Sequence, residues 1–174
     1  MHFLPTFSFV IGGASSGKSR WAENLVASNC SRPIYVATAE AVDEEMTNRI
    51  ELHRRRRGSC WRTVECPVDL HLEVARHSAE SIVLVECLPT WTANLLHYGV
   101  KVPDQYELLV AAIENSRCQL VVVSSEVGCG VIPESALARE FAQLLGEFNQ
   151  QLAAMAGLVV LITAGIPLVL KGEV

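Results

Sequence analysis

A stretch near the amino terminus matches a phosphate-binding pattern and so limits the folds available to this chain. Residues 12–19 read GGASSGKS, which fits G-x-x-x-x-G-K-[ST]. The apolar run Phe7–Ile11 precedes them, and Trp21, Leu25 and Val26 follow at helical spacing. A strand that turns through glycines into a helix presents backbone N–H groups and a helix N-terminus to phosphate oxygens. We therefore predict an α/β fold that binds a nucleotide, in preference to a chance Gly/Ser-rich turn.

The residues of this phosphate loop have distinct predicted roles. The Lys18 amine can reach the outer phosphates, so we expect it to be catalytic, and the Ser19 hydroxyl is placed to bind Mg²⁺. Glu86 is a second expected metal ligand, because it ends an apolar run and ligands meet the carboxyl ends of parallel strands. The alternative is an acid that merely ends a strand. The predicted triphosphate contacts of the loop are Gly12, Gly13, Ala14, Ser15, Ser16, Gly17, Lys18 and Ser19.

Apolar runs alternate with helical patterns along the chain, which is typical of a parallel sheet with crossover helices. A chain of 174 residues has the length of one ordinary domain, and half of its residues are apolar, which is enough for a sizeable core. We therefore expect a single domain over residues 1–174. Its expected fold is α/β and P-loop NTPase-like, with a mostly parallel sheet flanked by helices. The clearest helix is predicted over Pro133–Met155. The predicted strands are Phe7–Ile11, Ile34–Thr38, Ile82–Glu86, Gln119–Ser124 and Leu158–Thr163, with Trp61–Glu65 as a further candidate and Pro167–Lys171 as an antiparallel edge candidate.

Two features bear on where the protein works. The segment Phe148–Leu170 has no charged side chain and is long enough to cross a bilayer. Gly157, Gly165 and Pro167 interrupt it, so we interpret it as a helix end, a buried strand and a turn, and expect no membrane span. The six cysteines form no C-x-x-C pair, which favours reduced thiols in a cytoplasmic protein over disulfides or a zinc site.

An arginine-rich helix with a histidine is predicted after the second strand. Asp43 is a suitable N-cap, acids follow it, and four consecutive arginines end the segment at Arg57. Met46, Ile50 and His53 are spaced four and three apart, so they share the face expected to meet the protein body. One interpretation is a solvated arginine face with a packed histidine. The other is that the arginines clamp phosphates and lower the pKa of a nucleophilic imidazole. The spacing alone leaves both interpretations open.

Several longer segments carry a resemblance that covers nearly the whole chain. They read GGASSGKS, YVATAEAVDEEMTNRIELHRRRRGSCWRTVECPVDL, VLVECLPTWTANLL, SSEVGCGVIPESALAREFAQLLGEFNQQLAAMA and AGIPLVLK. The most specific parts are R-I-x-x-H, followed by W-R-T-V-E, and the block E-V-G-x-G-x-x-P-E. In this order the segments resemble the bifunctional adenosylcobinamide kinase / adenosylcobinamide-phosphate guanylyltransferase family of cobalamin biosynthesis.

The resemblance implies a two-step activity on a corrinoid substrate. ATP or GTP would first phosphorylate the aminopropanol hydroxyl of adenosylcobinamide. A histidine, which falls on His53 here, would then attack the α-phosphorus of GTP and pass GMP to the cobinamide phosphate, giving adenosylcobinamide-GDP. Mg²⁺ and a homotrimer are also implied. The further implied nucleotide contacts are Thr38, Ala39, Glu40, Arg54, Arg55, Arg56, Arg57, Glu65 and Glu86.

The chain departs from the family pattern at two positions. The usual phosphate loop GGARSGKS has an arginine where this chain has Ser15, which lies outside the fixed pattern. The usual N-E-V-G block begins here with Ser125, so a hydroxyl replaces an amide and shortens a potential contact. Neither change affects His53, Lys18 or Glu86.

Other functions are less favoured by the residues. A small-molecule kinase without nucleotidyl transfer would make His53 merely structural. A nucleotide-sensing GTPase module is disfavoured because the chain lacks N-K-x-D and a D-x-x-G after a strand. Nucleic acid is not an expected partner, because the net charge is −5, the arginine cluster is short and no aromatic platform surrounds it.

Overall fold

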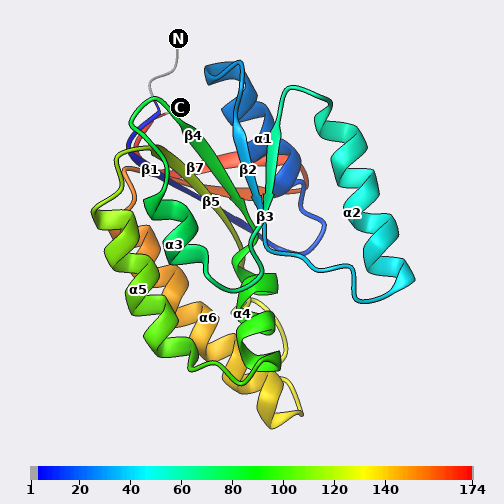
Figure 1. Ribbon diagram of the computed structural model, residues 1–174. Coiled ribbons are helices and arrows are strands. Elements are labelled where there is room, and N and C mark those ends of the chain that lie inside the picture. Colours follow the sequence, from blue (N-terminus) through cyan, green and yellow to red (C-terminus); the bar gives the residue numbers. More distant parts are fainter. Residues whose placement is uncertain (1–3, 174) are drawn as a thin grey trace.

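The computed structural model describes residues 4–173, in which strands and helices alternate (Figure 1). The strands are β1 (Phe7–Gly12), β2 (Ile34–Ala37), β3 (Arg62–Glu65), β4 (Ile82–Glu86), β5 (Gln119–Ser125), β6 (Leu158–Thr163) and β7 (Ile166–Lys171). The helices are α1 (Lys18–Asn29), α2 (Glu44–Arg57), α3 (Leu70–Ala75), α4 (Leu88–His97), α5 (Val102–Glu114) and α6 (Ala136–Met155).

All of these strands belong to one sheet with the order β3-β2-β4-β5-β1-β6-β7. The first six run parallel, and β7 pairs antiparallel with β6 at the edge. Strand β1, which leads into the phosphate loop, lies between β5 and β6. The loops after β1, β2, β3 and β4 therefore leave the same end of the sheet, where α/β proteins bind ligands.

The helices cover the sheet on two faces because successive strand residues point to opposite sides. Val10 of β1 belongs to a core with Ala22 and Val26 of α1. Its neighbour Phe9 belongs to the other core, which α3, α4, α5 and α6 cover together. In Figure 1 these four helices lie on one side of the sheet, whereas α2 stands beside α1 near the β3 edge. Helix α2 is thus the least enclosed helix, with mostly exposed side chains.

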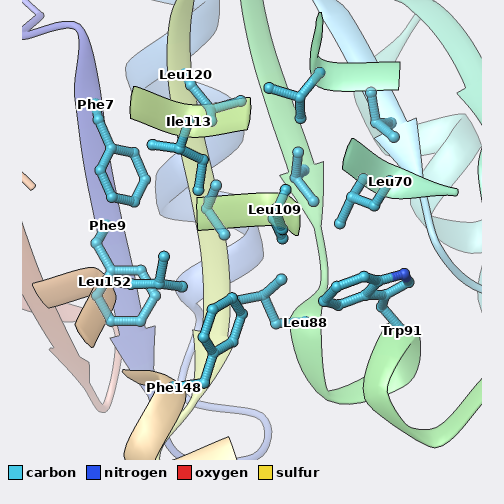
Figure 2. Close-up of a cluster of buried hydrophobic side chains, with 14 of the residues drawn as sticks. Phe7, Phe9, Leu70, Leu88, Trp91, Leu109, Ile113, Leu120, Phe148 and Leu152 are labelled. Atoms are coloured by element: carbon cyan, nitrogen blue, oxygen red, sulfur yellow. The ribbon is translucent and has the colours of Figure 1, made fainter. Parts of the chain in front are cut away.

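An aromatic cluster anchors the larger core. The rings of Tyr106 and Phe148 are stacked with centroids 3.8 Å apart, and Trp91 lies 5.8 Å from Tyr106. Figure 2 shows Leu88, Trp91 and Phe148 near one another in the cluster of buried side chains. These aromatic side chains come from α4, α5 and α6, so their contact fixes α4 against the other helices.

The predicted strands are all present, with ends that differ by at most one residue. The candidates at Trp61–Glu65 and Pro167–Lys171 are confirmed as β3 and the antiparallel β7. Phe148–Leu170 is the end of α6, strand β6 and a turn into β7. No helix within residues 4–173 is long and apolar enough to span a membrane.

The start of the predicted helix Pro133–Met155 is wrong. Helix α6 begins at Ala136, and the preceding Ser135 has an extended backbone with φ −70° and ψ 129°. The Arg139 side chain donates hydrogen bonds to the carbonyl oxygens of Pro133 and Glu134 at 2.9 Å and 2.6 Å. These carbonyls are therefore bound from the first turn of the helix rather than within it.

We predict that Phe148→Ala lowers the free energy of unfolding by about 3–5 kcal/mol, because it opens a cavity beneath the aromatic cluster. Phe148 is 2% exposed, whereas Leu137 on the same helix is 60% exposed. The control Leu137→Ala should therefore cost less than about 0.5 kcal/mol. Urea denaturation of both variants measures the difference, and similar losses would contradict the assigned core.

Candidate functional site

The phosphate loop has a backbone that requires glycine at two positions. A Cβ on Gly12 would lie 2.5 Å from the Ile162 carbonyl oxygen and 2.6 Å from Ser16 Oγ. Gly17 has φ +94°, a left-handed conformation that side chains disfavour. The loop is held by Gly165 N–H, which donates to the Ser16 carbonyl at 2.8 Å. The glycines of the motif are thus required by the tight curve and by the nearby β6 and its turn.

The two functional side chains at the start of α1 already have partners within the site. Lys18 is largely buried, and its Nζ donates to the Gly13 carbonyl at 3.0 Å, across the loop. The Ser19 hydroxyl donates to Oε1 of Glu86 at 2.5 Å. Ser19 and Glu86 are 67 residues apart, so the sheet order brings together the hydroxyl and carboxylate that we predicted as metal ligands.

The Glu86 carboxylate is suited to a cation. Burial raises its pKa from 4.5 to about 7, although the Ser19 hydrogen bond and the charge of Lys18 act in the opposite direction. Its second oxygen, Oε2, is buried and has no hydrogen-bond partner among the described residues. A buried oxygen without a donor is costly unless a cation or a proton meets it. Ser19 and Glu86 therefore fit Mg²⁺ as hydroxyl and carboxylate ligands.

The described chain supplies few further metal ligands. No group of three or more His, Cys, Asp or Glu side chains within residues 4–173 is arranged to hold a metal ion. Magnesium is commonly bound by one or two protein ligands, with the rest of its shell from substrate phosphates and water. Two protein ligands, Ser19 and Glu86, agree with this pattern.

Helix α2 presents one face to the protein, as the spacing predicts. Asp43 caps the helix, and its carboxylate accepts the Met46 N–H at 2.7 Å. Met46, Ile50 and His53 are half-buried, while most of the helix is exposed. All three line the same pocket, so His53 points toward the site.

The four arginines at the end of α2 differ in their contacts. Arg54 pairs with Glu65 at 3.2 Å, and Arg55 points outward to Glu51 on its own helix. Arg56 pairs at 2.8 Å with Glu23, a buried carboxylate of α1. The sequence treated the four arginines together, either as a solvated face or as a phosphate clamp, but the helix turn sends successive side chains in different directions.

Arg57 is the most buried of these arginines. Its side chain is 4% exposed, and its guanidinium lies 3.4 Å from the centre of the Tyr35 ring. The Glu23 carboxylate is 3.8 Å away. Arg56 and Arg57 therefore attach the end of α2 to α1 and β2. The Arg49 side chain is outside the described residues.

A pocket of about 450 Å³ lies between α2 and the carboxyl ends of β2, β3 and β4, and we call it the α2 pocket. It does not include the phosphate loop among its lining residues, but Glu86 lines it while also contacting Ser19. The two parts of the site therefore meet at Glu86. The predicted residues that line the pocket are Ala39, Glu40, His53, Arg54, Arg57, Glu65 and Glu86.

Thr38, Arg55 and Arg56, which were also predicted, do not line the pocket. Thr38 is fully buried, and its hydroxyl accepts the Cys87 N–H at 2.8 Å. It therefore joins the ends of β2 and β4.

Sequence reasoning missed several side chains that shape the site. Glu23 could have been found, because it is an acid beside Ala22 and Val26 on the apolar face of α1. Asn94 and Tyr98 of the α4 region gave no such signal. Their partners lie more than 25 residues away in the sequence.

The two departures from the family pattern lie in the phosphate loop and at the end of β5. Ser15 has φ +56°, in the left-handed region. At the other departure, the Ser125 carbonyl accepts a hydrogen bond from Asn149 Nδ2 at 3.0 Å. The next residue, Glu126, donates its N–H to the Gly12 carbonyl at 3.1 Å, so the loop after β5 borders the phosphate loop.

Several known proteins are similar to this chain over most of its length. The family model described as cobinamide kinase / cobinamide phosphate guanyltransferase matches residues 8–170. The bifunctional adenosylcobalamin biosynthesis protein CobU of Escherichia coli (strain K12) is 41% identical, over 93% of this chain and 98% of that protein. CobP of Pseudomonas aeruginosa, described in the same words, is 39% identical over 94% of this chain and 96% of its own length.

Comparison with solved structures shows similarity to this chain in the fold alone. The flagellar accessory protein FlaH from Methanocaldococcus jannaschii has a TM-score of 0.50 at 13% identity, over 96% of this chain and 78% of that chain. An ATPase of a bacterial type III secretion system has a TM-score of 0.50 at 9% identity, over 90% of this chain and 51% of that chain. The fold is P-loop NTPase-like. With relatives about 40% identical over most of their length and a family model spanning nearly all of its residues, the chain belongs to the cobinamide kinase / cobinamide phosphate guanyltransferase family.

Proposed function

We propose that this chain phosphorylates adenosylcobinamide with ATP or GTP and then transfers GMP from GTP to the resulting cobinamide phosphate through His53. Family membership supports both activities. The assignment of residues to these activities rests on one observation: the carboxylate of Glu86 belongs to both parts of the site. Glu86 contacts Ser19 of the phosphate loop and lines the pocket that contains His53. One domain would therefore serve both steps.

In the kinase step the phosphate loop would hold the triphosphate. Backbone N–H groups of the loop would bind phosphate oxygens, and Lys18 would exchange its Gly13 carbonyl for the outer phosphates. Ser19 and Glu86 would hold Mg²⁺, which when bound supplies positive charge against the phosphate oxygens. The substrate hydroxyl oxygen would attack the γ-phosphorus and form a new O–P bond, while its proton passes to water. The bond from that phosphorus to the β,γ-bridging oxygen would break, and the nucleoside diphosphate would leave with the electron pair.

In the guanylyl step an imidazole nitrogen of His53 would attack the α-phosphorus of GTP. The new N–P bond replaces the bond to pyrophosphate, which leaves with its electron pair. A phosphate oxygen of the cobinamide phosphate then attacks the same phosphorus, the N–P bond breaks, and adenosylcobinamide-GDP forms. Arg54 and Arg57 line the pocket and can bind the phosphates, because guanidinium groups match phosphate oxygens in geometry and charge.

We expect α-phosphate-labelled GTP and Mg²⁺ to label the wild-type protein covalently, with label that survives base and is lost in acid, as a phosphoramidate is. His53→Ala should lose the label but keep ATP-dependent phosphorylation of adenosylcobinamide. Lys18→Ala should lose both activities, because both need a bound triphosphate. Autoradiography and a product assay measure the two activities. Label that persists in His53→Ala would exclude this nucleophile, and wild type without label that still phosphorylates would indicate a simple kinase.

We predict that Glu86→Gln raises the half-saturating Mg²⁺ concentration of the kinase step about tenfold, because the amide keeps the shape of the side chain but loses its charge. A Mg²⁺ titration at saturating ATP and adenosylcobinamide measures this. Glu114→Gln, at an exposed position of α5, is the control and should leave the titration unchanged. An unchanged Mg²⁺ requirement in Glu86→Gln would remove Glu86 from the metal site.

We also propose that the protein is a homotrimer that works in the cytoplasm. The resemblance implies the trimer, and β7 supports an intersubunit contact because it is an edge strand that exposes Ile166, Leu168 and Leu170. All six cysteines are free, which suits a reducing compartment.

Light scattering after size-exclusion chromatography should therefore give three times the chain mass of 19.0 kDa. Leu168→Lys should shift the mass toward that of one chain if β7 lies in the interface. A mass of one chain for the wild type would contradict the trimer.

A further inference from the structure

Side chains on one face of α4 donate hydrogen bonds to the loops that contribute lining residues to the α2 pocket. Trp91, Asn94 and Tyr98 are spaced three and four residues apart, so they lie on this face. Trp91 Nε1 donates to the Val68 carbonyl after β3 at 2.6 Å. The Tyr98 hydroxyl donates to both carboxylate oxygens of Glu40 after β2, at 3.0 Å and 2.8 Å. Trp91 also packs in the buried cluster seen in Figure 2, so this face of α4 is attached to the core.

Asn94 is the centre of this face because it joins two loops with one side chain. Its Nδ2 donates to the Thr38 carbonyl at 2.8 Å and to the Pro67 carbonyl at 3.1 Å. Thr38 follows β2, and Pro67 follows β3. The Thr38 hydroxyl in turn accepts the Cys87 N–H after β4. A single amide therefore links three neighbouring strand ends, two directly and the third through Thr38.

These contacts begin where the sheet's own hydrogen bonds stop. The last paired residues are Ala37 with Glu65 and with Glu86. The final backbone bonds run from Cys66 N–H to Ala37 and from Thr38 N–H to Glu86. Beyond these backbone bonds, the Asn94 side chain joins the segments after β2 and β3 that the ladder no longer pairs.

The linked segments carry the predicted nucleotide contacts. Ala39 and Glu40 follow Thr38 directly, Glu65 is two residues before Pro67, and Glu86 precedes Cys87. All four line the α2 pocket, whereas Asn94 does not. We propose that Asn94 is a positioning residue that holds these pocket residues in the arrangement that binds GTP. This inference rests on the proposed function of the pocket.

The chemistry of the contact calls for an amide. The two N–H groups on one nitrogen can serve two carbonyl oxygens at once. An aspartate side chain has nearly the same shape but no N–H donor, so it would place a negative charge next to the carbonyl oxygens of Thr38 and Pro67. Leucine would fill the space and leave both carbonyls without this donor. The sheet itself would persist in either variant, because its backbone pairs do not involve Asn94.

The test measures binding of guanosine 5′-(α,β-methylene)triphosphate, a GTP analogue whose α,β bridge cannot be cleaved, by titration calorimetry with Mg²⁺. Asn94→Asp and Asn94→Leu should each weaken binding about tenfold or more, the size expected for two lost hydrogen bonds. The control is Asn115→Leu, which loses a similar bond from Nδ2 to the Ala111 carbonyl at 2.7 Å at an exposed helix end. It should bind like the wild type.

A second readout separates positioning from loss of structure. In single-turnover labelling of His53 by GTP, the Asn94 variants should raise the half-saturating GTP concentration about tenfold and change the maximal rate less than about threefold. Urea denaturation of each variant checks that it is folded. If Asn94→Leu does not fold, the binding and labelling measurements are made with Asn94→Asp alone.

Analogue binding equal to wild type in a folded Asn94 variant would overturn the inference. So would a loss of maximal rate without a change in half-saturation. Wild-type protein that binds the analogue but is never labelled would instead refute the proposed guanylyl transfer, and the binding comparison would still decide the role of Asn94.

Discussion

A single buried carboxylate joins the two halves of this site. Glu86 ends β4, accepts a hydrogen bond from Ser19 at the start of α1, and lines the pocket that holds His53. Burial raises its pKa to about 7, and its second oxygen has no hydrogen-bond partner among the described residues. A carboxylate in such a place costs free energy unless a cation binds it. In the proposed function, the metal ion of a bound nucleotide would meet that cost where the phosphate loop adjoins the α2 pocket.

The parallel sheet makes this meeting possible because it gathers its functional loops at one end. The order β3-β2-β4-β5-β1 sets the phosphate loop, Glu86, the Thr38 segment and Glu65 along one edge. Helix α4 supports this edge from the core side, and α2 closes the pocket from the other. The attachment of α2 relies largely on its arginines, which pair with Glu23 and Glu65 and, at Arg57, pack over the Tyr35 ring. Arg54 and Arg57 line the pocket while they hold these partners, so under the proposed function a nucleotide would compete with Glu65 and Glu23 for them.

Particular residues show how far sequence reasoning reached. Asp43 as a cap and the shared face of Met46, Ile50 and His53 were predicted, because capping and helical periodicity depend on neighbouring residues. The start of α6 was misplaced by three residues, because Pro133 suits a first turn but the helix begins at Ala136. The spacing left open whether the arginine cluster is a solvated face or a phosphate clamp, and the resemblance implied nucleotide contacts for all four members. In the structure their side chains divide among Glu65, Glu51 and Glu23. No local pattern states which distant acid each arginine meets.

Local patterns in the chain were enough to predict the phosphate loop, the alternation of strands and helices, and the inward face of the histidine helix. Each follows from spacing within a short stretch, where backbone geometry fixes which side chains lie together. Three contacts could be found only in the folded molecule: Ser19 with Glu86, Glu23 with Arg56, and Asn94 with the segments after β2 and β3. These contacts depend on the order in which crossover helices place the strands, and that order results from packing across the whole chain.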